Sequence, residues 1–226
     1  MSKQNTVFPS AKKYVANHIL IPAGFVKGRG LFARHTNGQF HGVEFQASKY
    51  GGEYFVNVAF HYDFVPAITP LRKDLRPKYT EFSLLDFMLH TRLRSLMPPG
   101  YPRSWQYDEG TEKVEEQMEE NTKNAIAVLD AFGARWKDPA DFLRTVTPEL
   151  IQENLQMLAA GKGPRPVEVA IGPWIFDYFD FSCCLALIAV HLGQLPLARS
   201  YLEIAKPISD QYSAKFLAEL AVQFGL

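Results

Sequence analysis

The sequence has very little cysteine, no excess of either charge and no long hydrophobic run. Its 226 residues include two cysteines, and 24 Lys and Arg residues balance 24 Asp and Glu residues. Zero net charge argues against a nucleic acid or an anionic membrane recognised mainly by bulk charge. No apolar run reaches about 18 residues, and the start, MSKQNTVFPSAKK, has no apolar signal core. We therefore expect a soluble, cytoplasmic protein that binds neither nucleic acid nor membrane.

The common motifs of metal and nucleophile chemistry are also missing. Cys183 and Cys184 are adjacent in an apolar run, and helical neighbours point about 100° apart, so we expect buried thiols in a reducing compartment. The six histidines show no HxxxH, HxH or Cys/His spacing. No G-x-S-x-G motif occurs, and neither cysteine has a polar setting. The sequence predicts no metal, no disulfide and no cofactor.

The stretch from residue 30 to residue 62 is the most informative part of the chain, because its alternation predicts two consecutive β-hairpins. Asn37-Gly38 is typical of a two-residue type I′ turn, in which both central residues need a positive φ. This turn places Arg34 opposite His41 and Phe32 opposite Val43.

A second two-residue turn at Gly51-Gly52 would place Phe45 opposite Val58 and Gln46 opposite Asn57. Cross-strand partners share a face of the sheet. The two hairpins then separate an apolar face from a mixed face, and we expect only the apolar face to pack on the core. The apolar face carries Phe32, Val43, Phe45, Ala47, Val56, Val58 and Phe60. The mixed face carries Ala33, His35, Glu44, Gln46, Asn57, Ala59 and His61.

The rest of the chain is predicted to be mostly helical. Residues 82–96 are ambiguous: alternation favours a fourth strand with a basic face, while Leu84, Leu85 and Met88 also suit a helix. Asp138-Pro139 and Thr147-Pro148 are typical helix starts. Further helices are predicted at residues 9–23, from Thr111, and at residues 180–191, 196–205 and 209–224.

These elements predict an α+β fold with an antiparallel sheet of three or four strands. Helices pack on one face of the sheet, and a helical C-terminal part follows. We expect an α+β domain over residues 1–162 and a helical extension over residues 167–226, with the boundary in the loop of residues 161–166.

The C-terminal part contains a faint repeat. The segment CLALIAVHLG at residues 184–193 aligns with FLAELAVQFG at residues 216–225, at an offset of 32 residues. The small and aromatic positions are similar to those of a tetratricopeptide helix pair, but they cover about one and a half repeats, and a solenoid needs about three. The segment is either a peptide-binding repeat or an αα-hairpin that packs on the core.

Residues 10–145 resemble the family called domain of unknown function 4304. The resemblance is carried by the following residues and motifs: Leu20, Gly24-Phe25, Phe32 and Arg34; F-Q-x-S at residues 45–48; F-x-N-V at residues 55–58; Arg92-Leu93-Arg94 and Ser104-Trp105. Such domains resemble proteins found near bacterial toxin and immunity genes, which implies a bacterial protein of immunity type. The resemblance brings no catalytic residue.

The mixed face is the candidate ligand-binding site, because amides are unusual in the middle of a wet strand. A carboxylate, a histidine and two arginines could hold an anionic ligand or the charged side chain of a partner. The alternative is a solvated face without a ligand. The candidate residues are Glu44, Gln46, Asn57, His61, Arg92 and Arg94.

Two function hypotheses follow. The first is a non-enzymatic binding protein of bacterial toxin-immunity type, which would block another protein. The second is a small-ligand-binding domain or an enzyme that uses the mixed face. A binding protein needs an exposed, rimmed patch, whereas an enzyme needs a concave pocket with a perturbed pKa inside it.

Overall fold

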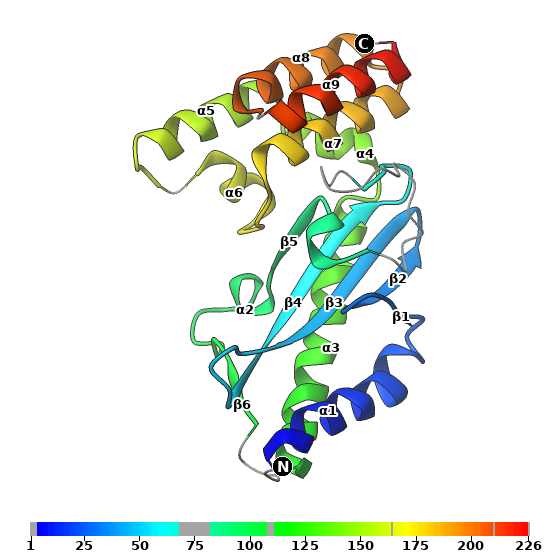
Figure 1. The fold of residues 1–226 in the computed structure, drawn as a ribbon, viewed down its shortest axis with the longest axis vertical. Helices are drawn as coiled ribbons and strands as arrows, with labels where there is room; N and C mark the ends of the chain where they lie inside the picture. The colour runs from blue at the N-terminus through cyan, green and yellow to red at the C-terminus, as the bar shows by residue number, and fades with distance from the viewer. Residues whose placement is uncertain (1–3, 68–81, 108–110, 164, 210, 226) are drawn as a thin grey trace. The chain divides into compact units, whose positions relative to one another are not determined.

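The chain divides into two units, each made of two separate stretches of sequence. The computed structural model describes residues 4–67, 82–107, 111–163, 165–209 and 211–225. Unit 1 consists of Met1–His61 and Lys78–Ala134, and unit 2 consists of Tyr62–Pro77 and Arg135–Leu226. The chain therefore leaves unit 1 after the second hairpin, returns to it, and leaves it again at the end of its longest helix (Figure 1).

Unit 1 is built on an antiparallel sheet, as predicted, with more strands than the three or four expected. The strand order is β1-β2-β3-β4-β5, and β6 pairs with β4. The strands are β1 (Val26–Lys27), β2 (Phe32–Thr36), β3 (Gln39–Ala47), β4 (Glu53–Tyr62), β5 (Leu89–Arg92) and β6 (Trp105–Gln106). The α+β class is therefore confirmed.

The first hairpin has the predicted register. Arg34 is the partner of His41, and Phe32 is the partner of Val43. Asn37, with φ of 51°, and Gly38, with φ of 78°, form the turn. This is the geometry that the Asn-Gly pair predicts, because both residues tolerate a positive φ.

The prediction of a two-residue turn at Gly51-Gly52 in the second hairpin is wrong. The backbone N–H of Ser48 donates to the carbonyl of Glu53 at 2.8 Å, so residues 49–52 form a four-residue loop. Continued along the ladder, this pairing shifts the predicted register by two residues and puts Asn57 opposite Glu44. Because the side-chain period of a strand is two, the shift leaves both faces intact.

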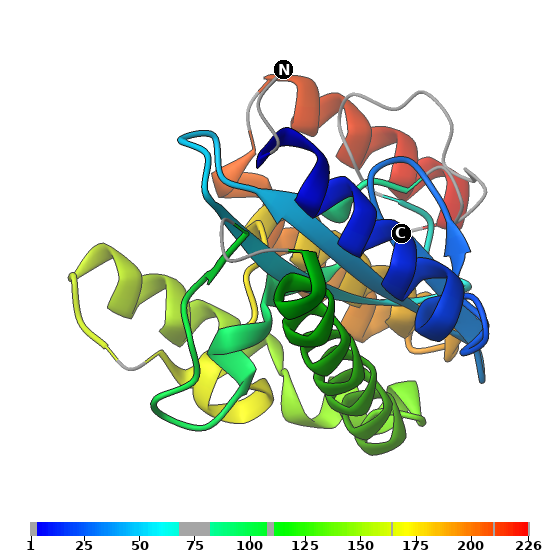
Figure 2. The ribbon, with the colours of Figure 1, turned by 90° about the horizontal axis from the view of Figure 1, so that it is seen from below.

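The helices of unit 1 cover the apolar face of this sheet. These elements are α1 (Gln4–Val15), the π-helical turn η1 (Ala16–Leu20) and α3 (Thr111–Arg135). The Phe8 ring of α1 lies 5.7 Å from the Tyr54 ring, and the Phe132 ring of α3 lies 4.9 Å from the Phe60 ring. Tyr54 and Phe60 both lie on the apolar face of β4, so both helices pack on one side of the strands (Figure 2).

The segment that was ambiguous between strand and helix contains both. It forms the 3₁₀ turn η3 (Leu84–Asp86), the strand β5, and the single helical turn α2 (Leu93–Leu96). β5 pairs with β4, with Val58 opposite Thr91 and Asn57 opposite Arg92. The alternation of residues 89–92 therefore correctly indicated a strand, which ends at Arg92.

The expectation that only one face of the sheet packs on the core is wrong at one end of the sheet. Ala33, Ala59 and His61 on the mixed face are fully buried. Phe82 and Phe87, which flank η3, place their rings 5.6 Å and 6.2 Å from the His61 ring. A segment distant in sequence thus covers this end of the mixed face.

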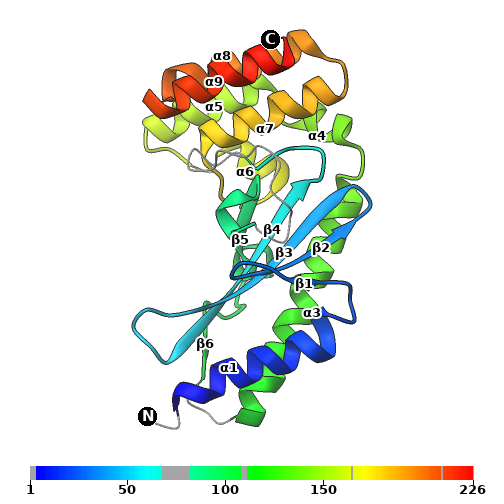
Figure 3. The ribbon, with the colours of Figure 1, turned by 45° about the vertical axis from the view of Figure 1, so that its right-hand side comes forward.

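Unit 2 is helical. Its helices are α4 (Pro139–Thr145), α5 (Pro148–Ala159), α6 (Pro166–Ile171), α7 (Tyr178–His191), α8 (Leu195–Ala205), the 3₁₀ turn η4 (Lys206–Ile208) and α9 (Gln211–Phe224). The predicted caps form: Asp138 accepts from the Ala140 N–H at 2.8 Å, and Thr147 accepts from the Leu150 N–H at 3.3 Å. α7 is buried along nearly its whole length and lies against α8, so the two form an αα-hairpin (Figure 3).

Candidate functional site

Asn57 organises the exposed part of the mixed face, which we call the polar face and define by Glu44, Gln46, Phe55, Asn57 and Arg92. The Asn57 amide nitrogen donates to Glu44 Oε2 at 2.7 Å and to Gln46 Oε1 at 3.1 Å. A side-chain amide has two N–H donors, and both are used here. Asn57 is 4% exposed, so these bonds fix its side chain and hold the carboxylate of Glu44 in place.

Arg92 lies directly across from Asn57 on β5. Its guanidinium carbon stands 3.7 Å from the centre of the Phe55 ring, which is a cation–π contact. Stacking engages the flat face of the guanidinium and leaves its N–H edge available for a carboxylate. The arginine is half-buried and held by the ring contact, so its positive charge lies on one side of Asn57 and the negative charge of Glu44 on the other.

Glu44 also has a second cation near it. Lys12 of α1 donates from Nζ to the Phe45 carbonyl at 3.4 Å. Burial lowers the pKa of Lys12, and the charge of Glu44 opposes that shift, while the charge of Lys27 adds to it. The carboxylate of Glu44 is therefore flanked by protein charges at the edge of the polar face.

Two of the predicted site residues lie apart from this cluster. His61 is fully buried, and its Nδ1 accepts a hydrogen bond from the Met88 N–H at 3.0 Å. Arg94 is half-buried and belongs to the helical turn α2, because β5 ends two residues earlier. The structure thus brings together Glu44, Gln46, Asn57 and Arg92, whose assignment to a ligand stays a prediction.

His90 is a polar-face neighbour that the sequence argument did not select. It lies two residues before Arg92 on β5, opposite Ala59, so its side chain points to the same face as that of Arg92. Burial lowers the pKa of His90, and its Nδ1 is buried without a hydrogen-bond partner in the described chain. The alternation of basic residues along β5 was the signal that could have found it.

A second polar cluster joins the first hairpin to the C-terminal end of α3. Arg34 Nη2 bonds to Asp130 Oδ1 and lies 3.1 Å from His41 Nδ1. His41 Nε2 lies 3.3 Å from Gln39 Oε1, and the Gln39 amide donates to the Gly133 carbonyl at 3.1 Å. We call these five residues the hairpin–helix cluster.

Electrostatics keep His41 neutral in this cluster. Burial lowers its pKa to about 4, the Arg34 charge adds to the shift, and Asp130 opposes it. His41 is 2% exposed and Arg34 also stacks on the Phe25 ring at 4.8 Å. The sequence argument paired Arg34 with His41 but gave them no role, because the helix end that meets them is 96 residues away from Arg34.

The described residues form neither a metal-binding group nor a reactive thiol. No group of three or more His, Cys, Asp or Glu side chains there could hold a metal ion. Cys183 and Cys184 are buried free thiols in α7, and burial raises the pKa of both. Thiols of this kind are poor nucleophiles. None of the described helices combines the length and the apolar character that crossing a membrane requires.

The fold and the polar face define an α+β domain that carries a fixed charged surface. Residues 16–133 match the family model described as Domain of unknown function (DUF4304). The match covers more than half of the chain, so the protein belongs to that family. It ends at residue 133, one residue before the end of unit 1. No curated protein and no solved structure matches the chain.

Proposed function

We propose that the protein is a non-enzymatic binding protein that holds a protein partner on its polar face. The observation that supports this proposal is the fixed pair of opposite charges at Glu44 and Arg92, on either side of Asn57. Side chains already held in place lose little conformational entropy on binding. Arginine is also enriched among the residues that dominate binding energy at protein interfaces.

The chemistry of the polar face suits recognition better than catalysis. Both donors of the Asn57 amide are used by Glu44 and Gln46, and the aromatic face of Phe55 is covered by Arg92. The N–H edge of Arg92 is open to a partner, and it forms bidentate bonds with a carboxylate. We therefore expect the partner to place an Asp or Glu side chain against Arg92.

In its specific form, this proposal makes the partner a toxin that the protein blocks. The resemblance described from the sequence supports that form. A small anionic ligand on the same face is the competing function, and a single set of variants separates the two.

The experiment compares the wild-type chain with Arg92→Ala and with the matched control Arg103→Ala, an exposed arginine of the same unit. Proteins recovered with each tagged chain from the native host are identified, and their affinities are measured by calorimetry. We expect Arg92→Ala to weaken the binding of the partner by more than about 1 kcal/mol, because it removes a charge-assisted contact. Arg103→Ala should leave the affinity unchanged.

Two outcomes would overturn the proposal. If a partner binds equally to wild type and to a chain that carries both Arg92→Ala and Glu44→Ala, its surface lies elsewhere. If a small anion, rather than a protein, is recovered with wild type and lost with Arg92→Ala, the polar face is a ligand site.

A further inference from the structure

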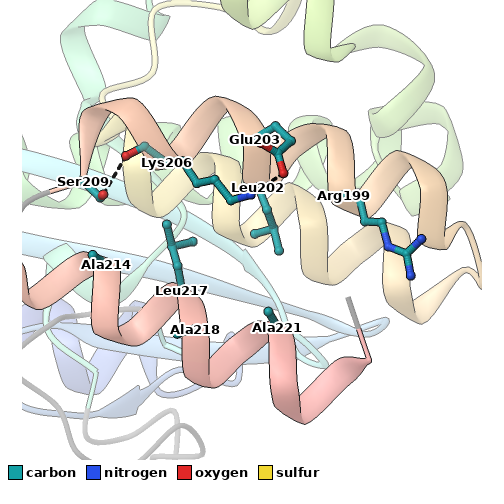
Figure 4. A pocket seen from close by; sticks show the side chains of 9 residues that line it. All are labelled: Arg199, Leu202, Glu203, Lys206, Ser209, Ala214, Leu217, Ala218 and Ala221. Atoms are coloured by element: carbon teal, nitrogen blue, oxygen red, sulfur yellow. Dashed lines mark hydrogen bonds and ion pairs between the residues drawn. The ribbon is translucent and has the colours of Figure 1, made fainter.

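Helices α8 and α9 of unit 2 enclose a groove of about 480 Å³ that the polar face does not explain. Figure 4 shows Leu202 of α8 and Leu217 of α9 pointing toward each other across it. Both leucines are buried, at 5% and 7% exposed, so they form its floor. The volume lies within the range of small-molecule sites, which are mostly apolar with a few polar groups.

Apart from Leu217 on its floor, the described α9 side chains that line the groove are small, and this keeps the groove open. Ala214, Ala218 and Ala221 line it from α9, and none of them reaches across to α8. α9 is held in place from another side: its Phe216 ring lies 6.5 Å from the Phe179 ring of α7, and Leu220 is 1% exposed. The opening therefore follows from the side chains that line two anchored helices.

One polar group on the rim is uncommitted. Lys206 is ion-paired with Glu203, and the Ser209 hydroxyl donates to the Lys206 carbonyl at 2.7 Å. Arg199 lines the other end of the groove, is exposed, and makes no ion pair or hydrogen bond with any described residue. Among the described residues that line the groove, Arg199 is thus the charged group that is available to a ligand.

We propose that the groove binds a small amphipathic anion, an unbranched aliphatic carboxylate, with its head on Arg199 and its chain between α8 and α9. A guanidinium matches a carboxylate bidentately. The described apolar lining consists of leucine and alanine and includes no aromatic ring, so it offers an alkyl chain close packing and offers a flat ring no stacking partner.

The test is calorimetric titration of the full chain with decanoate, below its aggregation concentration. We expect one decanoate per chain and a weaker affinity, by about tenfold or more, for Arg199→Ala. Ala218→Leu should abolish binding, since it fills the groove from an exposed helical position that tolerates leucine. The control is Lys215→Ala, which removes an exposed α9 charge outside the lining and should bind decanoate as wild type does.

The charge assignment has its own arm. Decyltrimethylammonium has the same chain length and the opposite charge, so it should bind at least about tenfold more weakly than decanoate. The proposal is overturned if decanoate shows no saturable binding, if several molecules bind each chain, or if Ala218→Leu binds as wild type does. Equal binding of the two probes, or unchanged affinity in Arg199→Ala, would also overturn it.

Discussion

Arg34 of β2 is ion-paired with Asp130 of α3, which lies 96 residues further along the chain. The two side chains differ in their surroundings, since that of Arg34 is 14% exposed and that of Asp130 is 52% exposed. The pair joins the first hairpin to the last turns of α3, and Arg34 makes further contacts with His41 and Phe25. We therefore treat Arg34 as the structural centre of the hairpin–helix cluster.

The first prediction concerns the unequal importance of this pair. Arg34→Ala should lower the free energy of unfolding by about 2–4 kcal/mol, because it removes a mostly buried cation with several contacts. Asp130→Asn should cost about 1 kcal/mol or less, since a half-exposed carboxylate is replaced by an amide whose oxygen can still accept from Arg34. Urea unfolding of both variants measures the difference. Equal costs would show that the ion pair itself, rather than the other Arg34 contacts, stabilises the hairpin.

The second prediction concerns pH and His41. Its pKa is about 4 in the folded chain and 6.5 in the unfolded reference, so the unfolded chain binds more protons between these values. The free energy of unfolding should therefore fall as the pH drops from about 6.5 to about 4, by about 3 kcal/mol from this residue. His41→Gln, measured beside wild type by urea unfolding at pH 7.5 and pH 4.5, should lose less stability on acidification. A His41 imidazole seen by NMR to titrate near pH 6.5 would contradict this.

The third prediction concerns Gly133 in α3. A Cβ at this position would lie 2.5 Å from Gln39 Oε1 and 2.8 Å from His41 Nε2. Gly→Ala in a helix ordinarily stabilises by up to about 1 kcal/mol, but here overpacking should destabilise by about 1–3 kcal/mol. Thermal and urea unfolding of Gly133→Ala measure the sign. Adding Gln39→Ala should recover part of the loss, because it removes one of the clashing atoms; a more stable Gly133→Ala protein would refute the packing argument.

The fourth prediction concerns Asp180 near the start of α7. Burial, with a smaller contribution from Asp177, raises its pKa to about 7, and its Oδ1 is buried without a partner in the described chain. The folded chain therefore holds the proton longer than the unfolded chain, and stability falls as the pH rises from about 4 to about 7. At pH 8, Asp180→Asn should be more stable than wild type by on the order of 1–3 kcal/mol.

At pH 4 most of that advantage should vanish, because Asp180 is then protonated in the folded chain, and the carboxyl of the unfolded chain, with a pKa of 3.8, is only about half ionised. The matched control is Asp141→Asn, an exposed carboxylate on α4 that is paired with Arg144. It should show no comparable gain at pH 8. A destabilised Asp180→Asn protein at pH 8 would mean that the ionised carboxylate is favoured by the helix N-terminus.

The fifth prediction tests which face of β3 packs on the core. Phe45 is 3% exposed and its neighbour Gln46 is exposed. Phe45→Ala should cost about 3–5 kcal/mol as a core truncation. Gln46→Ala should cost only about 1 kcal/mol, the loss of one hydrogen bond from the Asn57 amide. Chemical unfolding of the two variants measures both, and similar costs would show that the faces are not separated as the structure has them.

Local signals account for the parts of the fold that the sequence predicted well. Asn37-Gly38 defined the first register because a two-residue turn leaves no freedom in the pairing. Asp138 and Thr147 marked helix starts because each cap is a contact within a few residues. Gly51-Gly52 misled because a glycine pair also suits a longer loop, although the period of two still kept Phe45 and Gln46 on their correct faces.

Long-range contacts account for the parts that the sequence did not predict. The burial of His61 depends on Phe82 and Phe87, which periodicity within β4 does not reveal. The Asp130 partner of Arg34 likewise depends on where α3 ends against the hairpin. Four of the six predicted site residues come together, because they lie on strands whose alternation was visible; His61 and Arg94 do not, because their surroundings depend on tertiary structure.

The division of the chain has a consequence for how this protein can be cut or recombined. Tyr62 donates its hydroxyl proton to the Trp136 carbonyl at 2.7 Å, and the Phe64 ring stacks on the His191 ring at 3.8 Å. A fragment that ends at residue 133, where the family match ends, would therefore contain Tyr62 and Phe64 without the helical residues that they contact. The C-terminal helices pack with a segment from the middle of the chain, so the two units do not follow each other as separate stretches of sequence. Domain boundaries chosen from sequence order alone would cut through one of its two cores.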